Sequence, residues 1–299
     1  MSQLCGVALV DKPVGPTSHD VVAAIRRASG QRRVGHAGTL DPLASGLLIV
    51  CLGPATRVAQ YLTQHDKVYQ VEARLGVETD TYDAEGEVVA EWTEPLPTDE
   101  AVDDAIASLC GEVLQVPPVF SAVKVGGTPL YRLARQGKPV QARPRRVMVH
   151  SIRWSRPEPQ RLVLRVHCSA GTYVRSLVQD LGRRLGCGAH VAALRRLASG
   201  PFSVSQALPL AEAVSRLERG EHGWMLDVGE ALPEQPRLLL DGDAAQRLAR
   251  GQAIEGPPPS SEDLHLAIGP DGRAFAVAEW DWERQSWIPR KVLIQECDP

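Results

Sequence analysis

The sequence lacks the features that mark membrane-spanning and secreted proteins. Its 299 residues contain no apolar run approaching the ~20 residues that a transmembrane helix requires. The first residues, MSQLCGVALVDK, contain neither the basic segment nor the apolar core of a secretory signal. We therefore expect a cytoplasmic protein that does not enter a membrane.

The sequence also lacks the cysteine spacings of metal sites and disulfide frameworks. Its six cysteines are scattered, without a CxxC pair and without the Cys/His spacing of a zinc ligand set. Several lie in apolar runs, where a free cysteine behaves as a small hydrophobic residue. Since disulfides are rare in a reducing cytoplasm, we predict neither disulfides nor a metal site. The six are Cys5, Cys51, Cys110, Cys168, Cys187 and Cys297.

Motifs of cofactor-dependent enzymes are absent as well. The chain has no Walker A motif and no GxGxxG fingerprint, which would cradle the phosphates of a nucleotide. It also lacks the HxE and PCxxC motifs of the zinc-dependent base deaminases. We therefore expect no cofactor, and we exclude that class of base-modifying enzyme.

Acidic residues are almost missing from one long segment. Residues 113–200 contain 16 Lys and Arg but only two acids, whereas the remainder contains 17 basic and 34 acidic residues. The net charge of −3 hides this asymmetry. A basic segment in an otherwise acidic protein is typical of a face that binds RNA or phosphate. The hydrophobic content of 43% and the length predict a globular protein with one large and one small domain.

The most informative segment is GHAGTLDPLASGLL, residues 35–48. Its glycines allow a tight loop, and Pro42 biases Asp41 toward an extended backbone. The apolar run LLIVCL that follows predicts a buried strand. Asp41 therefore lies on a stiff loop beside the core. From the residues alone, an Asp at such a position is more often a turn residue than a catalytic group.

Upstream of this loop, the segment VDKPVGPTSHDVV (residues 10–22) leads into a predicted helix that ends near Gly30. We predict that Ser18 is the N-cap of this helix and that Asp20 lies in its first turn, where the helix dipole favours an acid.

These two segments together closely resemble the two N-terminal motifs of the TruB family of tRNA pseudouridine synthases. GTYVR (residues 171–175) resembles the third motif of that family. The resemblance covers nearly the whole chain and is strongest over residues 6–83 and 116–197. It implies an α+β fold, the pseudouridine-synthase fold, in which flanking helices cover a mixed, largely antiparallel sheet. It also implies a catalytic domain over residues 1–232.

The resemblance implies three catalytic residues. Asp41 is the nucleophile, Arg175 pairs with it, and Tyr69, in the segment DKVY, lies beneath the target base. Arg175 is predicted to lie in the first turn of a helix, where the dipole disfavours a cation. A carboxylate partner would offset that placement, so we expect Asp41 and Arg175 to touch.

Three further residues are implied to bind the substrate. His36 fills the space that the flipped base vacates, Tyr173 contacts that base, and Leu194, in HVAALRRL, lines its pocket. From the residues alone, a loop histidine such as His36 is more often a polar surface group. An isolated tyrosine on a strand, such as Tyr69, is more often part of core or rim packing.

Residues 115–146 combine Pro, Gly and basic residues around one short predicted helix, residues 130–136. In the family, the corresponding segment is a mobile thumb that closes on the T-loop of tRNA. So much loop in a compact domain is more often functional than accidental. We therefore predict that its basic residues contact RNA phosphates. These residues are Arg132, Arg135, Lys138, Arg143, Arg145 and Arg146.

After the catalytic segment, LPEQPR (residues 232–237) is predicted to be a linker. The strand-rich segment that follows, residues 236–299, resembles the PUA module, a small β-rich RNA-binding domain. This similarity is weaker, and the segment is acidic.

The implied reaction converts a T-loop uridine of tRNA, at position 55, into pseudouridine. The expected partner is therefore the T-arm stem-loop of tRNA, and we expect a monomer without an obligate protein partner. The sequence leaves open whether Asp41 attacks C1′ of the ribose, attacks C6 of the base, or assists formation of a glycal. Two other classes also remain open at this point: a non-catalytic tRNA-binding or RNA-folding factor, and another base-modifying enzyme.

Overall fold

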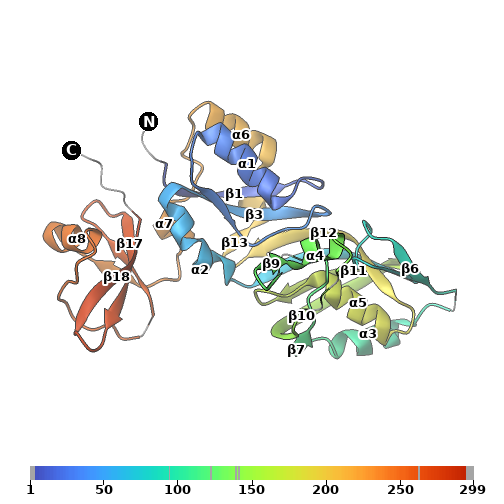
Figure 1. The fold of residues 1–299 in the computed structure, drawn as a ribbon. Helices are drawn as coiled ribbons and strands as arrows, with labels where there is room; N and C mark the ends of the chain where they lie inside the picture. Colours follow the sequence, from blue (N-terminus) through green and yellow to red (C-terminus); the bar gives the residue numbers. More distant parts are fainter. Residues whose placement is uncertain are drawn as a thin grey trace.

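The computed structural model describes residues 4–93, 95–121, 123–138, 140, 142–261 and 263–293. Figure 1 shows two parts, and each of them contains a β-sheet. The larger part has a ten-stranded sheet, and the smaller part has a four-stranded one. The strands of the large sheet are β1 (Gly6–Lys12), β2 (Val34–Ala37), β3 (Ala44–Leu52), β4 (Lys67–Leu75), β7 (Gly111–Gln115), β10 (Arg145–Glu158), β11 (Arg161–Cys168), β12 (Ala189–Ser199), β13 (Phe202–Ser203) and β14 (Leu208–Pro209).

The large sheet is mixed and mostly antiparallel, as predicted. Its main path runs β14-β1-β3-β12-β4-β11-β10-β7, and only the pairs β1/β14 and β12/β3 are parallel. Helices flank this sheet, so the predicted α+β class is confirmed. The helices are α1 (Ser18–Ser29), α2 (Ala59–Thr63), α3 (Asp99–Ala107), α4 (Leu130–Arg135), α5 (Val174–Arg184), α6 (Leu210–Glu218) and α7 (Val228–Ala231), with short 3-10 turns at Gly53–Val58 and Val204–Gln206.

The smaller part, orange to red in Figure 1, lies beside α2 and α7. Its sheet has the order β15-β16-β17-β18, and one helix, α8 (Gly242–Ala249), belongs to it. The strands are β15 (Arg237–Leu239), β16 (His265–Ile268), β17 (Ala274–Asp281) and β18 (Ser286–Val292). Two separate two-stranded ribbons occur elsewhere: β5 (Val77–Thr79) with β6 (Val88–Glu91), and β8 (Lys124–Val125) with β9 (Thr128–Pro129).

The apolar run of β3 is buried on both faces of the sheet. Alternate side chains of a strand point to opposite faces. Leu48 and Val50 therefore belong to one hydrophobic core with α1 and α5, whereas Leu47 and Ile49 belong to a second cluster. A continuous apolar run is expected for a strand that is covered on both sides. The predicted buried strand is confirmed.

The second cluster also joins the two parts of the molecule. It contains Leu47 and Ile49 from β3 and also Leu266, Ile268 and Val277 from the smaller sheet. The connection between α7 and β15 is short, as predicted, but Leu232 at its start is buried in the same cluster. The two parts therefore share a core and are not simply tethered.

In the part of the chain that the structure describes, no helix combines the length and the apolar character needed to cross a membrane.

Candidate active site

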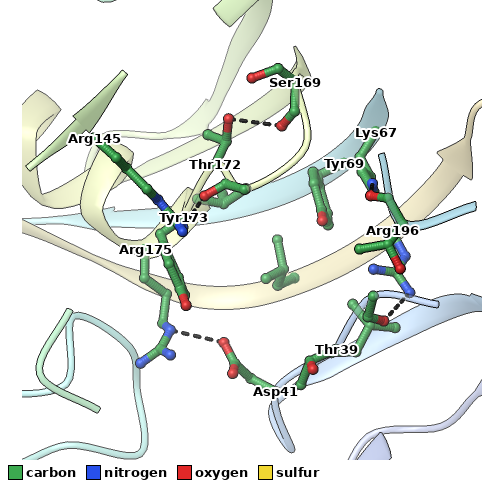
Figure 2. Close-up of a pocket in the computed structure, with 16 residues that line it drawn as sticks. Thr39, Asp41, Lys67, Tyr69, Arg145, Ser169, Thr172, Tyr173, Arg175 and Arg196 are labelled. Atoms are coloured by element: carbon green, nitrogen blue, oxygen red, sulfur yellow. Dashed lines mark hydrogen bonds and ion pairs between the residues drawn. The ribbon is translucent and has the colours of Figure 1, made fainter. Parts of the chain in front are cut away.

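A cavity of about 240 Å³ opens between the loop after β2, the first residues of β4, β12 and the turn that precedes α5 (Figure 2). Five of the residues singled out in the sequence line it, from segments far apart in the chain. They are Asp41, Tyr69, Tyr173, Arg175 and Leu194. Arg145, predicted as a phosphate contact, lines it too.

Asp41 and Arg175 form an ion pair at the edge of this cavity. Arg175 Nε lies 2.9 Å from Asp41 Oδ2, so the predicted contact is confirmed. The Arg175 side chain is 5% exposed, whereas that of Asp41 is 33% exposed. The guanidinium is therefore buried behind the carboxylate, and the carboxylate is the member of the pair that a substrate can reach.

Arg175 is held by three further contacts. Its Nη1 lies 3.2 Å from Asp83 Oδ2 and donates to the carbonyl of Thr81, while Nη2 donates to the carbonyl of Phe120. Arg175 is the second residue of α5, where the helix dipole opposes a cation. Two carboxylates and two carbonyls offset that unfavourable position. Only the planar fork of arginine reaches all of them together.

Asp83 is a site residue that the sequence analysis missed. Its buried carboxylate accepts hydrogen bonds from the Thr81 hydroxyl and the Glu85 amide. Between Thr81 and Asp83, Tyr82 has a left-handed backbone with φ of 65°. Such strain persists only where the surroundings fix the backbone, and it gathers at functional sites. The signal in the sequence is an acid in a polar turn, which is too common to single out.

The loop that carries Asp41 is held in place by Lys12 and Ser18, which belong to the preceding segment of residues 10–22. Lys12 is fully buried, and its Nζ donates to the carbonyls of Ala44 and Pro13 at 2.6 and 2.9 Å. The Ser18 hydroxyl bridges the backbone N–H and carbonyl of Leu40. Burial lowers the pKa of Lys12 to about 8, and the charge of Asp41 opposes this effect.

The prediction that Ser18 is the N-cap of α1 is wrong. The cap is Thr17, which forms a reciprocal capping box with Asp20. Both residues have hydroxyls, and a capping box requires the acid three residues after the cap, so the position of Asp20 favours Thr17. Ser18 is left free to hold the loop.

Arg196 closes the floor of the cavity from β12. It is 1% exposed, and its guanidinium donates to the carbonyls of Leu47 and Gly38. Its backbone pairs with Gly46, where a β-carbon would lie 2.3 Å from the Arg196 carbonyl oxygen. Only glycine permits this approach. The loop that carries Asp41 is thus fixed to the central sheet at both ends.

Tyr69 and Leu194 form the apolar wall. Both are buried, and both lie on the core face of their strands. Burial raises the pKa of Tyr69, although the guanidinium of Arg196 opposes it. The phenol is therefore neutral at physiological pH, and it offers a flat apolar surface with one hydroxyl.

Tyr173 and Arg145 form the opposite wall. The Arg145 guanidinium lies 4.6 Å from the centroid of the Tyr173 ring and donates to the carbonyl of Gly171. Arg145 is therefore part of the cavity. Arg146, by contrast, lies on the surface in an ion pair with Glu112.

His36 lies on β2 and is not one of the residues that line the cavity in the described part of the chain. Its Nδ1 is buried without a hydrogen-bond partner in the described part of the chain, and its ring contacts that of His19 edge to face. Burial lowers the pKa of His36 to about 4, so the ring is neutral at physiological pH.

The remaining predicted RNA contacts are all exposed: Arg132 and Arg135 on α4, Lys138 shortly after it, and Arg143 two residues before β10. Arg132 and Arg135 both lie within about 6 Å of the Tyr131 ring. Among the described residues, none of these four has an acidic side chain within 4.0 Å. We call these four exposed basic residues the α4 basic patch.

Burial raises the pKa of Asp41, while Arg175 beside it acts in the opposite direction. Asp83 adds to the rise because two carboxylates share one guanidinium. A partly desolvated carboxylate with one direct counter-ion is more basic and more nucleophilic than a fully hydrated one.

This fold matches chains of solved structures over nearly its whole length. The chain superposes on a chain of "Structure of H/ACA RNP bound to a substrate RNA containing 2'-deoxyuridine" with a TM-score of 0.73 and 25% identity, covering 98% of this chain and 86% of that one. It matches a chain of "Crystal Structure of a Cbf5-Nop10-Gar1 Complex" with a TM-score of 0.72 and 28% identity, covering 97% and 85%.

The sequence comparisons are more specific. The model of the "TruB family pseudouridylate synthase (N terminal domain)" matches residues 26–174, and that of the "tRNA pseudouridylate synthase B C-terminal domain" matches residues 175–222. Proteins named tRNA pseudouridine synthase B are 47% identical in Syntrophotalea carbinolica, over 92% of both chains, and 38% identical in Dehalococcoides mccartyi, over 98% of this chain and 97% of that one. The chain belongs to the TruB family of pseudouridylate synthases, and it has their fold.

Proposed function

We propose that this enzyme isomerises uridine 55 in the T-loop of tRNA to pseudouridine, with Asp41 as the nucleophile. The observation that carries this proposal is the Asp41–Arg175 ion pair, which presents a partly exposed carboxylate to a cavity with apolar walls. A protein that only binds or folds RNA needs no such group. The reaction rearranges the atoms of one nucleotide, so it needs no redox partner, group donor or cofactor.

In this proposal Asp41 reacts in its ionised form. The proposal covers three routes: attack on C1′, attack on C6, and assistance to a glycal intermediate. In each of them the glycosidic bond breaks, the base rotates, and a new bond forms from C5 to the ribose. Arg175 is a positioning residue that fixes the orientation of the carboxylate, and Asp83 in turn positions Arg175.

The target nucleotide has to leave its stack to reach Asp41, at a cost of a few kcal/mol. We propose that Tyr69 and Leu194 contact one face of the flipped base and that Tyr173 contacts it from the other side. A neutral phenol is a poor base, so Tyr69 acts mainly by packing. The neutral ring of His36 suits insertion into the space that the base vacates.

We further propose that residues 1–232 are the catalytic domain, with an RNA-binding thumb over about residues 115–146, and that residues 236–299 are a PUA-like RNA-binding domain. Within these ranges, residues 1–3, Glu94, Ala122, Pro139, Gln141, Glu262 and residues 294–299, including Cys297, lie outside the described residues. We propose that the enzyme acts in the cytoplasm as a monomer without an obligate protein partner.

The α4 basic patch gives a quantitative prediction. Changing Arg132, Arg135, Lys138 and Arg143 together to Gln should weaken tRNA binding and flatten its salt dependence. Each lost phosphate contact reduces the log–log slope by about 0.7–0.9. The measurement is the dissociation constant against salt concentration. A matched control changes Arg216 and Arg219 to Gln, because both are already paired with glutamates on α6 or just after it. An unchanged slope in the fourfold variant would exclude this patch from RNA binding.

The direct test of the proposed function is tritium release from a T-arm transcript labelled at C5 of uridine. Forming the bond from C5 to the ribose displaces that hydrogen, so turnover releases one tritium for each pseudouridine. We expect release from the transcript with uridine at position 55 and none when that position is cytidine. Release from both transcripts would move the target to another uridine. Binding without release from any tRNA would support a non-catalytic RNA-binding protein instead.

A further inference from the structure

A cluster of possible metal ligands lies outside the active site. Asp66 directly precedes β4, His150 lies in β10, and His167 lies in β11. One ligand atom from each lies within 4.8 Å of the other two. His150 Nε2 is 2.9 Å and His167 Nε2 is 3.8 Å from Asp66 Oδ2, and the two rings are 4.5 Å apart.

A β-bulge is responsible for this convergence. Val149 pairs with Cys168 and Ser151 pairs with His167, so His150 is the extra residue on β10. In a regular ladder, Val149 and His150 would point to opposite faces and His150 would have its own partner. Bulges re-aim side chains in this way, and they are treated as specified features of a fold. Here the bulge places His150 against His167, and Asp66 enters from the neighbouring strand.

The donors suit a borderline divalent ion. Two imidazole nitrogens and one carboxylate oxygen are a common ligand set for zinc, with bonds of about 2.0–2.2 Å and the remaining position open to water. Ligand atoms of one tetrahedral ion lie ~3.3 Å apart at those bond lengths. The distances from Asp66 to the two histidines lie on either side of that value, so small side-chain rotations suffice.

The three side chains are each between one third and one half exposed, so an ion can enter from solvent. Lys67, the basic side chain next in sequence, is directed elsewhere, because its Nζ donates to the carbonyls of Thr63 and His65. Asp66 is itself anchored, since its carbonyl accepts the amide of Gly200.

We propose that Asp66, His150 and His167 bind a zinc-like divalent cation at a site separate from the catalytic cavity. Bound there, the ion cross-links β10, β11 and the start of β4. These strand ends lead directly to Lys67, Tyr69 and Ser169, which line the cavity. The ion is thus structural: it stiffens the sheet edge that supports the active site and takes no part in the reaction.

Isothermal titration of the full-length, tag-free protein with Zn²⁺ tests this site. All proteins should contain Cys5→Ser, because Cys5 is an exposed free thiol that would bind zinc itself. We expect one saturable site per chain at pH 7.5. Mutation of a residue that only hydrogen-bonds to a metal ligand costs about 10–100-fold in metal affinity. Loss of a ligand itself should cost at least as much, so His150→Gln and His167→Gln should each lower the zinc affinity at least about tenfold.

His222→Gln, a half-exposed histidine after α6, is the matched control and should bind zinc like the parent protein. Zinc should raise the melting temperature of the parent and of this control but not of His150→Gln, since a ligand stabilises the state that binds it. The melting curves without zinc show that each variant is folded. Absence of saturable binding in the parent, or equal binding in all four proteins, would overturn the proposal.

Discussion

Asp41→Asn should abolish pseudouridine formation and leave tRNA binding intact. Asparagine keeps the size and shape of the side chain but cannot act as the nucleophile. Loss of a nucleophile commonly costs several kcal/mol of transition-state stabilisation, which corresponds to at least about a 10³-fold lower single-turnover rate. The measurement is single-turnover tritium release at saturating tRNA, beside a separate binding titration.

The variant should also be no less stable than the parent. Because burial raises the pKa of Asp41, the folded state binds the proton more tightly than the unfolded chain does. Ionised Asp41 therefore lowers the free energy of unfolding at neutral pH. The free energy of unfolding rises again as the pH falls through the raised pKa and Asp41 becomes protonated. The single-turnover rate of the parent should fall over the same range, since only the ionised form reacts.

Asp271→Asn, in an exposed turn of the smaller part, is the control for the same chemical change and should keep full activity. Turnover of Asp41→Asn close to that of this control, with deamidation excluded by mass spectrometry, would assign the nucleophile to another residue.

Arg175→Lys should bind tRNA normally and react about 10²–10³-fold more slowly. Loss of a residue that only orients the nucleophile removes part, but not all, of the rate enhancement that the nucleophile provides. Lysine keeps the charge but has one nitrogen in place of the fork, so it cannot contact Asp41, Asp83 and Phe120 together. The readout is the single-turnover rate at saturating tRNA, compared with the dissociation constant.

The double variant Asp41→Asn/Arg175→Lys separates positioning from independent catalysis. If Arg175 acts through Asp41, the double variant should be scarcely slower than Asp41→Asn alone, because residues that act as one unit are strongly non-additive. A rate for Arg175→Lys equal to that of the parent, or full additivity in the double variant, would contradict the positioning role.

Much of the candidate site could be predicted from the sequence because its residues lie in recognisable segments. The contact between Asp41 and Arg175 was expected both from the family resemblance and from the position of a cation in the first turn of a helix. The buried strand after the loop followed from its apolar run. Their roles in catalysis remain predictions, whereas their convergence on one cavity is a property of the structure.

The supporting residues could not be found in this way, because they act through the backbone. Lys12 holds the loop through the carbonyl of Ala44, and Arg196 holds it through those of Leu47 and Gly38. Every residue has a carbonyl, so no side-chain pattern marks such a partner. Asp83 escaped for a related reason: its place beside Arg175 depends on a left-handed Tyr82, which no residue type in that turn requires.

The hydrophobic cluster shared by β3 and the smaller sheet has a consequence for how the enzyme meets its substrate. Two domains joined by a flexible linker sample many relative orientations. When one of them binds an RNA, the effective concentration of the other at its own site on that RNA depends on the fraction of orientations that let both bind. A shared hydrophobic core restricts the two parts to one relative orientation. The smaller part is therefore held at a fixed distance and angle from the cavity. If it is the RNA-binding domain proposed above, we expect the protein to favour RNAs in which two features lie at the matching distance.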